Sequence, residues 1–252
     1  MDSRLASIII ITRNRLGYTR LCLQSILKKT IYRPYEIIVV DNNSTDGTVE
    51  YLTDLKNRGI IEKLILLDKN YGAGYATNEG IKHAKGFYLI RSDNDMVYNR
   101  GWLTALIDGL KRIPKSLLQV AVFGELMEDG QRAGFLPENI INGVILNLVN
   151  IGGCNMAFTR ETYEDLGPFD NVMFTEDGLY CFKAKQKGYI IGQIDNATGT
   201  HIDHPTCSLS KRYTEYAEYR LEVLENLKRA GLEFLCEEDQ KFYEEYKRKK
   251  KN

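Results

Sequence analysis

The fold class follows from residues 37–48, Ile37-Ile38-Val39-Val40-Asp41-Asn42-Asn43-Ser44-Thr45-Asp46-Gly47-Thr48. Its four branched apolar residues, Ile37–Val40, are typical of a strand buried on both faces. Turn-forming and helix-capping residues follow from Asp41 to Gly47, and a helical pattern begins at Thr48. A buried strand, a polar turn and a helix in this order predict an α/β fold with a mostly parallel sheet.

The same alternation extends in both directions along the chain. Upstream, the pattern predicts a strand at Ser7–Ile11 and a helix at Gly17–Lys29. Downstream, it predicts helices at 48–56, 75–84, 103–112, 160–165 and 178–186, and strands at 64–67, 87–90, 116–123, 140–149 and 189–194. No repeat or linker rich in proline and serine separates the halves. We therefore expect one domain over residues 1–210, with halves 1–100 and 101–210, followed by a helical extension at 211–252.

Composition excludes several classes of protein. Of 252 residues, 43% are hydrophobic and 27% are charged, which is ordinary for a soluble globular chain. Lys+Arg and Asp+Glu both number 34, so the net charge is zero, which argues against binding to nucleic acid. The five cysteines form no CxxC pair, so neither a disulfide framework nor a zinc knuckle is expected. No signal peptide or membrane-length apolar run stands out, and we expect a cytoplasmic location.

Acidic residues follow two of the expected strands. In open α/β sheets, ligands bind outside the carboxyl ends of the strands, and Asp41 stands at such an end. It is suited to bind a ribose or a base, although a capped turn explains it equally well. Neither GxGxxG nor GxxxxGK[ST] is present, which argues against a dinucleotide fold and a P-loop. Asp93 and Asp95 can converge on one Mg²⁺ or Mn²⁺ whose shell substrate phosphates complete, and their place after a strand favours this over turn chemistry.

Two further groups are weaker signals by themselves. Glu176 and Asp177 follow Thr175, as at a helix N-terminus where carboxylates satisfy free N–H groups. Capping is the favoured role, and one of the two acids is free to act as a general base. His201 and His204 are two of the three histidines and suit either a structural role or a transition metal.

Taken together, these segments resemble the inverting family 2 glycosyltransferases of GT-A fold. The resemblance covers about Ser7 to Ser208, and it is carried by the order and spacing of the motifs. They are Ile9–Asn14, Ile38–Thr48, Asn70–Gly74, Asn78–Ile81, Asp93–Asp95, Gly152–Phe158, Gly167–Asp170 and Glu176–Asp177. It implies a Rossmann-like nucleotide-sugar-binding half at 1–100, an acceptor-side half at 101–210, and a mixed central sheet flanked by helices.

The resemblance also implies roles for individual residues. Asp177 is the expected base, since the second acid usually fills that role, and Glu176 stands beside it at the catalytic position. Asp95 and Asp93 are expected to bind Mn²⁺ or Mg²⁺, with His204 preferred over His201 as a further ligand. The residues expected to contact the nucleotide-sugar are Thr12, Arg13, Asn14, Asp41, Asn43, Asn70, Gly72, Gly74, Asn78, Arg91, Asp93 and Asn94.

The implied activity is metal-dependent inverting transfer of a sugar from a nucleoside-diphosphate donor to an acceptor hydroxyl. UDP is the commonest donor nucleotide in the family, with GDP and dTDP as alternatives, and the acceptor is a glycan, lipid-linked or protein-linked. A non-catalytic binding module and a nucleotidyltransferase are the alternatives. The latter is disfavoured because the segment after the first strand offers only Gly17 for a phosphate loop. The tyrosine-rich, basic C-terminus, ending in Lys247–Lys251, suits a solvated helical pair, an anionic membrane surface or a homodimer.

Overall fold

The structure is a computed structural model that describes residues 4–123, 138–148, 151–152, 154–172 and 176–202, with residues 244 and 248. The chain divides into two units, residues 1–207 and 208–252, and the fold given below is that of the first. His204, the helices expected beyond residue 211 and the basic end at 247–251 lie outside the described residues.

Helices and strands alternate along the described chain as expected for its first half. In order, the elements are β1 (Ala6–Thr12), α1 (Leu16–Lys29), β2 (Tyr35–Asp41), α2 (Thr48–Asn57), β3 (Lys63–Leu66), α3 (Ala73–His83), β4 (Tyr88–Asp93), β5 (Met96–Tyr98), α4 (Trp102–Arg112), β6 (Ser116–Phe123), β7 (Glu138–Ile141), β8 (Val144–Asn147), β9 (Asn155–Thr159), α5 (Arg160–Leu166), α6 (Glu176–Gln186) and β10 (Ile190–His201).

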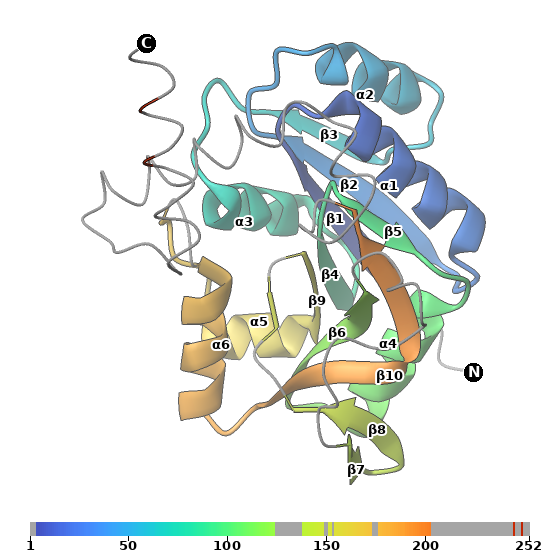
Figure 1. Ribbon diagram of the computed structural model, residues 1–252, viewed down its shortest axis with the longest axis vertical. Helices are drawn as coiled ribbons and strands as arrows, with labels where there is room; N and C mark the ends of the chain where they lie inside the picture. The colour runs from blue at the N-terminus through green and yellow to red at the C-terminus, as the bar shows by residue number, and fades with distance from the viewer. Residues whose placement is uncertain are drawn as a thin grey trace. The chain divides into compact units, whose positions relative to one another are not determined.

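One mixed sheet contains all the strands that the structure describes (Figure 1). Its order is β3-β2-β1-β4-β9-β6-β10-β8-β7, with β5 paired to β10. The first four strands are parallel, whereas β9 runs antiparallel to both β4 and β6. The expected α/β architecture with a mixed central sheet is therefore confirmed.

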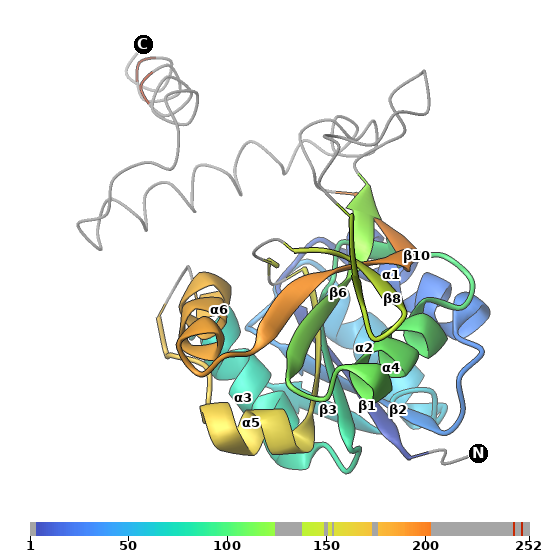
Figure 2. The same ribbon diagram turned by 90° about the horizontal axis from the view of Figure 1, so that it is seen from below.

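Helices cover both faces of the sheet (Figures 1 and 2). Because successive side chains of a strand point to opposite faces, Ile8 and Ile10 of β1 join a core with α1, α2 and α4. Ile9 and Ile11 join a second core with α3, α5 and α6. Burial on both faces explains why β1 and β2 are runs of isoleucine and valine.

The parallel register brings polar residues of three strands to one edge. Thr12 of β1 is level with Asp41 of β2, and Ile11 is level with Asp93 of β4. Because β1 lies between β2 and β4, the carboxyl ends of these strands are adjacent. The acids that the sequence placed after two separate strands therefore share one edge of the sheet.

The second half departs from the sequence-based expectation. The prediction of a single strand over 140–149 is wrong. The chain turns back at Asn142 and Gly143, whose φ angles are 49° and 75°, so that β7 pairs with β8. Asn-Gly with two positive φ angles is the preferred two-residue hairpin turn. The short strands β5 and β9 were not expected. β10 continues to His201, so this histidine lies on the strand and not after it.

Candidate active site

The loops that follow β1, β2 and β4 are tied together by side-chain amides. The Asn94 amide donates to the hydroxyls of Thr12 and Thr19, at 3.1 and 2.9 Å. The backbone N–H of Asn14 donates to Ser44 Oγ at 2.6 Å, and Asn14 Oδ1 accepts from the N–H of Thr45 at 2.7 Å. These bonds fix the three loops relative to one another at the carboxyl edge of the sheet.

Asp41 closes the turn that follows β2. Its Oδ1 accepts from the N–H of Ser44 at 2.8 Å, and its Oδ2 accepts from the Ser44 hydroxyl at 2.5 Å. The residue is 1% exposed, and burial raises the pKa of its carboxyl although the bonds from Ser44 oppose that rise. The capped turn that the sequence allowed is present. A nucleoside contact would use the remaining lone pairs of the same two oxygens.

Asn42 holds the loop between β3 and α3 against the β2 turn. Its amide donates to the carbonyl of Gly72 at 3.2 Å, and its Oδ1 accepts from the N–H of Tyr71 at 2.9 Å. Asn70 Oδ1 accepts from the N–H of Gly72 at 3.1 Å. Sequence reasoning did not assign Asn42 a part in the site. The motif contains it, but its partners lie about 30 residues away in sequence, beyond the reach of local turn patterns.

Two residues that the resemblance assigns to the donor lie where α3 meets the chain before α6. The amide of Asn78 donates to the carbonyl of Phe169 at 2.9 Å, and its Oδ1 accepts from the N–H of Phe169 at 3.0 Å. A Cβ on Gly74 would lie 2.3 Å from the carbonyl oxygen of Asp170 and 3.2 Å from the Cβ of Glu176. Asn78 thus ties α3 to the segment between α5 and α6, and Gly74 lets α3 approach that segment and α6 closely. The contact of either residue with a donor stays a prediction.

We expect Gly74→Ala to lower the free energy of unfolding by about 1–3 kcal/mol, because the added methyl group meets a backbone oxygen that cannot rotate away. Gly178→Ala is the matched control in α6, since no described atom lies within 4 Å of its added Cβ. Alanine favours a helix over glycine by up to about 1 kcal/mol. Urea denaturation measures both variants. Equal stability of Gly74→Ala and the native protein would contradict the close approach.

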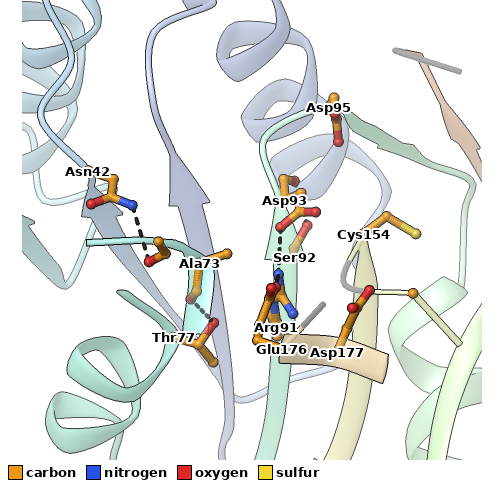
Figure 3. A network of polar contacts seen from close by, with 12 residues as sticks. Asn42, Ala73, Thr77, Arg91, Ser92, Asp93, Asp95, Cys154, Glu176 and Asp177 are labelled. Atoms are coloured by element: carbon orange, nitrogen blue, oxygen red, sulfur yellow. Dashed lines mark hydrogen bonds and ion pairs between the residues drawn. The ribbon is translucent and has the colours of Figure 1, made fainter. Parts of the chain in front are cut away.

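Arg91 joins β4 to the N-terminus of α6 (Figure 3). It is 2% exposed, and strand alternation places it on the same face as Asp93. Its Nη2 lies 2.7 Å from Glu176 Oε1 and 3.4 Å from Asp93 Oδ1. One buried cation is therefore shared by an acid of the strand end and an acid of the helix.

Burial and mutual repulsion set the charges of this cluster. Burial lowers the pKa of Arg91, but Asp93, Glu176 and Asp177 outweigh burial and raise that pKa above its usual value. Burial raises the pKa of Asp93 to about 7, with Arg91 opposing the shift and Asp95 and Glu176 adding to it. The Asp93 side chain is nevertheless 32% exposed, which leaves it open to a ligand.

The two acids of α6 differ in their surroundings. Glu176 is buried and bonded to Arg91. Asp177 is partly exposed, and its Oδ1 accepts from the N–H of Gly178 at 2.7 Å. Its Oδ2 lies 3.6 Å from where a Cβ of Gly152 would stand. A Cβ at Gly152 would thus be in ordinary contact with Asp177 Oδ2, whereas Glu176 is bonded to Arg91 as its counter-ion.

Asp95 contacts two basic side chains. Its Oδ2 lies 2.8 Å from Arg15 Nη2 and 3.3 Å from His201 Nε2. Although burial raises the pKa of Asp95, His201 and Arg15 outweigh burial and hold it well below the usual range. Sequence reasoning named Asp95 and His201 but missed Arg15, which lies 80 residues from its partner. Arg15 does follow directly on the first motif.

A divalent metal can be tested against these side chains. Among the described residues, no three His, Cys, Asp or Glu side chains form a ready metal-binding group. Asp95 Oδ1, however, is buried and has no hydrogen-bond partner among them. A buried carboxylate oxygen of this kind is a hard ligand suited to Mg²⁺ or Mn²⁺. Asp95 and the part-exposed Asp93 therefore fit a divalent cation that also takes ligands from its substrate.

A known protein family matches more than half of this chain. The model of the family described as "Glycosyl transferase family 2" matches residues 7–167. The chain belongs to glycosyl transferase family 2. Within this family, it is 25% identical over 228 residues to the glycosyltransferase AglE of Haloferax volcanii, covering 86% of this chain and 73% of that protein.

Two further relatives are, like AglE, longer than this chain. A dolichyl N-acetyl-alpha-D-glucosaminyl phosphate 3-beta-D-2,3-diacetamido-2,3-dideoxy-beta-D-glucuronosyltransferase of Methanococcus voltae is 28% identical over 202 residues. That match covers 78% of this chain and 59% of that protein. The poly-beta-1,6-N-acetyl-D-glucosamine synthase of Staphylococcus aureus is 26% identical over 172 residues, 64% of this chain and 41% of the synthase.

Solved structures show that the fold is that of GT-A glycosyltransferases. The mannosyltransferase PcManGT from Pyrobaculum calidifontis, in complex with GDP-Man and Mn²⁺, is 18% identical with a TM-score of 0.64, covering 90% of this chain and 64% of that one. GalNAc-T7 with UDP, GalNAc and Mn²⁺ is 17% identical with a TM-score of 0.64, covering 79% and 44%. Within the described residues, no helix has the length and apolarity needed to span a membrane.

Proposed function

We propose that this chain catalyses metal-dependent, inverting transfer of a sugar from a nucleoside-diphosphate donor to an acceptor hydroxyl. The observation that carries the proposal is the link from Asp93 through Arg91 to Glu176. It places the acidic end of β4 beside the first turn of α6, where Asp177 stands partly exposed. The buried guanidinium of Arg91 thereby holds a site for the donor phosphates next to a candidate base.

The carboxyl edge of the sheet divides into a nucleoside end and a phosphate end. Thr12 and Asp41 end the paired strands β1 and β2, and Asn14 follows β1 and bonds to the turn after β2. We assign these three residues to the nucleoside. Asp93 ends the neighbouring strand β4 and Asp95 follows it, and we assign both to a divalent cation and the donor phosphates. Mn²⁺ or Mg²⁺ bound there supplies neutralisation of the charge on the departing nucleoside diphosphate.

Asp177 is assigned as the base of a single displacement. Its carboxylate accepts the proton of the acceptor hydroxyl, and that oxygen bonds to the anomeric carbon of the donor. The bond from this carbon to the diphosphate oxygen breaks as the new bond forms, so the configuration inverts. Glu176 is unsuited to this step because its carboxylate is buried against Arg91.

We expect one nucleoside diphosphate from a panel of UDP, GDP and dTDP to stabilise the protein with Mn²⁺ and not with EDTA. A ligand at 100 times its Kd adds ~2.7 kcal/mol to the free energy of unfolding, which a thermal-shift assay detects. Transfer to an acceptor, or donor hydrolysis, then separates an enzyme from a non-catalytic binding module. Release of pyrophosphate from a nucleoside triphosphate supplied with a sugar 1-phosphate would favour a nucleotidyltransferase, and no response to any nucleotide would contradict the proposal.

We expect Asp41→Ala to weaken binding of that nucleotide by roughly tenfold or more, since a hydrogen bond to a charged group contributes about 1.5–3 kcal/mol. Asp54→Ala is the matched control, because Asp54 is exposed on α2 and pairs only with Arg58 among the described residues. Calorimetric titration in Mn²⁺ measures both. Native affinity in a folded Asp41→Ala variant would leave Asp41 as a turn residue alone.

The relatives and the sequence also suggest an acceptor, a location and partners. The name of the Methanococcus voltae relative contains dolichyl N-acetyl-alpha-D-glucosaminyl phosphate, and we propose a lipid-linked or glycan hydroxyl as the acceptor here. A cytoplasmic location, contact of residues 247–251 with anionic lipids and a homodimer remain parts of this proposal.

A further inference from the structure

A buried ion pair links the first loop of the fold to the acidic turn after β4. Arg15 Nη2 lies 2.8 Å from Asp95 Oδ2, and each side chain is 8% exposed. The guanidinium also lies over the ring of Tyr18, 4.5 Å from its centroid. Isolated ion pairs on the surface contribute little to stability, but both side chains of this pair are shielded from solvent. The arginine is thus held firmly against one oxygen of Asp95.

The backbone that delivers Arg15 is strained. Asn14 and Arg15 have φ angles of 55° and 62°, two successive left-handed residues, neither of which is glycine. Such conformations are costly for residues other than glycine and persist where the surroundings enforce them. Here the bonds from Asn14 to Ser44 and Thr45 enforce the turn. The loop is therefore built to present an arginine at this position.

The two carboxylate oxygens of Asp95 have different contacts. Oδ2 faces both Arg15 Nη2 and, at 3.3 Å, His201 Nε2. Arg15 comes from the start of α1 and His201 from the end of β10, so the two contacts reach the carboxylate from separate elements. Oδ1 is buried and has no hydrogen-bond partner in the described chain. A carboxylate fixed through one oxygen keeps the other in a set direction.

We propose that Arg15 is a positioning residue that holds Asp95 by Oδ2 so that Oδ1 binds the divalent cation. The inference rests on the proposed function, since it assigns a partner to the same metal site. Residues that orient a metal ligand typically change metal affinity by 10–100-fold when they are removed. A competing role, in which Arg15 occupies the place of the cation, is disfavoured because Arg15 contacts Oδ2 and leaves Oδ1 without a hydrogen-bond partner among the described residues.

The test is a titration with Mn²⁺ in the presence of the nucleoside diphosphate that binds best. Electron paramagnetic resonance measures the free Mn²⁺ and hence the Kd for the metal. We expect Arg15→Met and Arg15→Gln each to weaken Mn²⁺ binding by tenfold or more. Arg20→Met is the matched control, because Arg20 is exposed on α1, the helix that directly follows Arg15, and lies over Tyr51. If the Met variant does not fold, the Gln variant carries the test, since it removes the charge and keeps a hydrogen-bond donor.

A second readout separates positioning from damage to the fold. At saturating Mn²⁺, both Arg15 variants should recover native nucleotide affinity, because mass action compensates a weaker metal site and does not repair a misfolded one. Unchanged or tighter Mn²⁺ binding in these variants would overturn the inference. Absence of Mn²⁺ binding in the native protein would instead overturn the metal dependence in the proposed function.

Discussion

We expect Asp177→Asn to lower the rate of sugar transfer by roughly 10²–10⁴-fold, the usual contribution of a general base. Asparagine keeps the size of the side chain and an oxygen that accepts from the N–H of Gly178, but its amide cannot take the acceptor proton. Donor affinity should stay near the native value, because the nucleoside and the phosphates are assigned to residues at the carboxyl ends of β1, β2 and β4 and not to Asp177. The loss should therefore appear in kcat.

Steady-state transfer kinetics and a nucleotide titration together measure this split. Glu164→Gln is the matched control, an exposed acid on the neighbouring helix α5, and it should transfer at the native rate. Asp177→Asn with native turnover would remove Asp177 as the base. Equal losses of donor affinity and rate would place Asp177 at the donor and not at the acceptor hydroxyl.

The first half of the fold could be predicted because its signals are local. The strands β1 and β2 are continuous branched runs, and β1, β2 and β4 are followed by polar turns, so strand positions and their parallel order follow from the sequence. The strands β5 and β9 are only 3 and 5 residues long. They form because β10 and β4 offer partners, which no local pattern shows.

The acids of the site could be located from the sequence, but their partners could not. Asp41, Asp93 and Asp95 follow strands whose carboxyl ends meet, so their shared edge is predictable from topology alone. The division of roles between Glu176 and Asp177 is different. It depends on which side chain of α6 faces Arg91 across 85 residues of sequence. Arg15 was missed for the same reason, since its partner is set by tertiary structure.

We expect Arg91→Met to lower the free energy of unfolding by about 3–5 kcal/mol, the range for breaking a buried ion pair by removing one partner. Methionine fills much of the volume of the arginine stem, so the loss is electrostatic. Glu176 is left buried without its counter-ion, and Asp93 loses the cation that opposes the rise of its pKa. Arg112→Met is the matched control, because its pair with Asp108 is 48% and 49% exposed, and it should cost at most about 1 kcal/mol.

The double variant Arg91→Met/Glu176→Gln distinguishes charge from packing. If the stranded carboxylate causes the loss, neutralising Glu176 should restore a large part of the stability, because a buried neutral amide avoids the desolvation cost of an unpaired charge. Urea denaturation of the native protein, both single variants and the double variant completes the cycle. Strict additivity of the two single losses would show that Arg91 and Glu176 act independently. A coupling between the two substitutions would show that the ion pair of Arg91 with Glu176 holds β4 and α6 together. That ion pair would then also hold Asp93 and Asp177, the acids assigned to the donor and to the acceptor proton, in place.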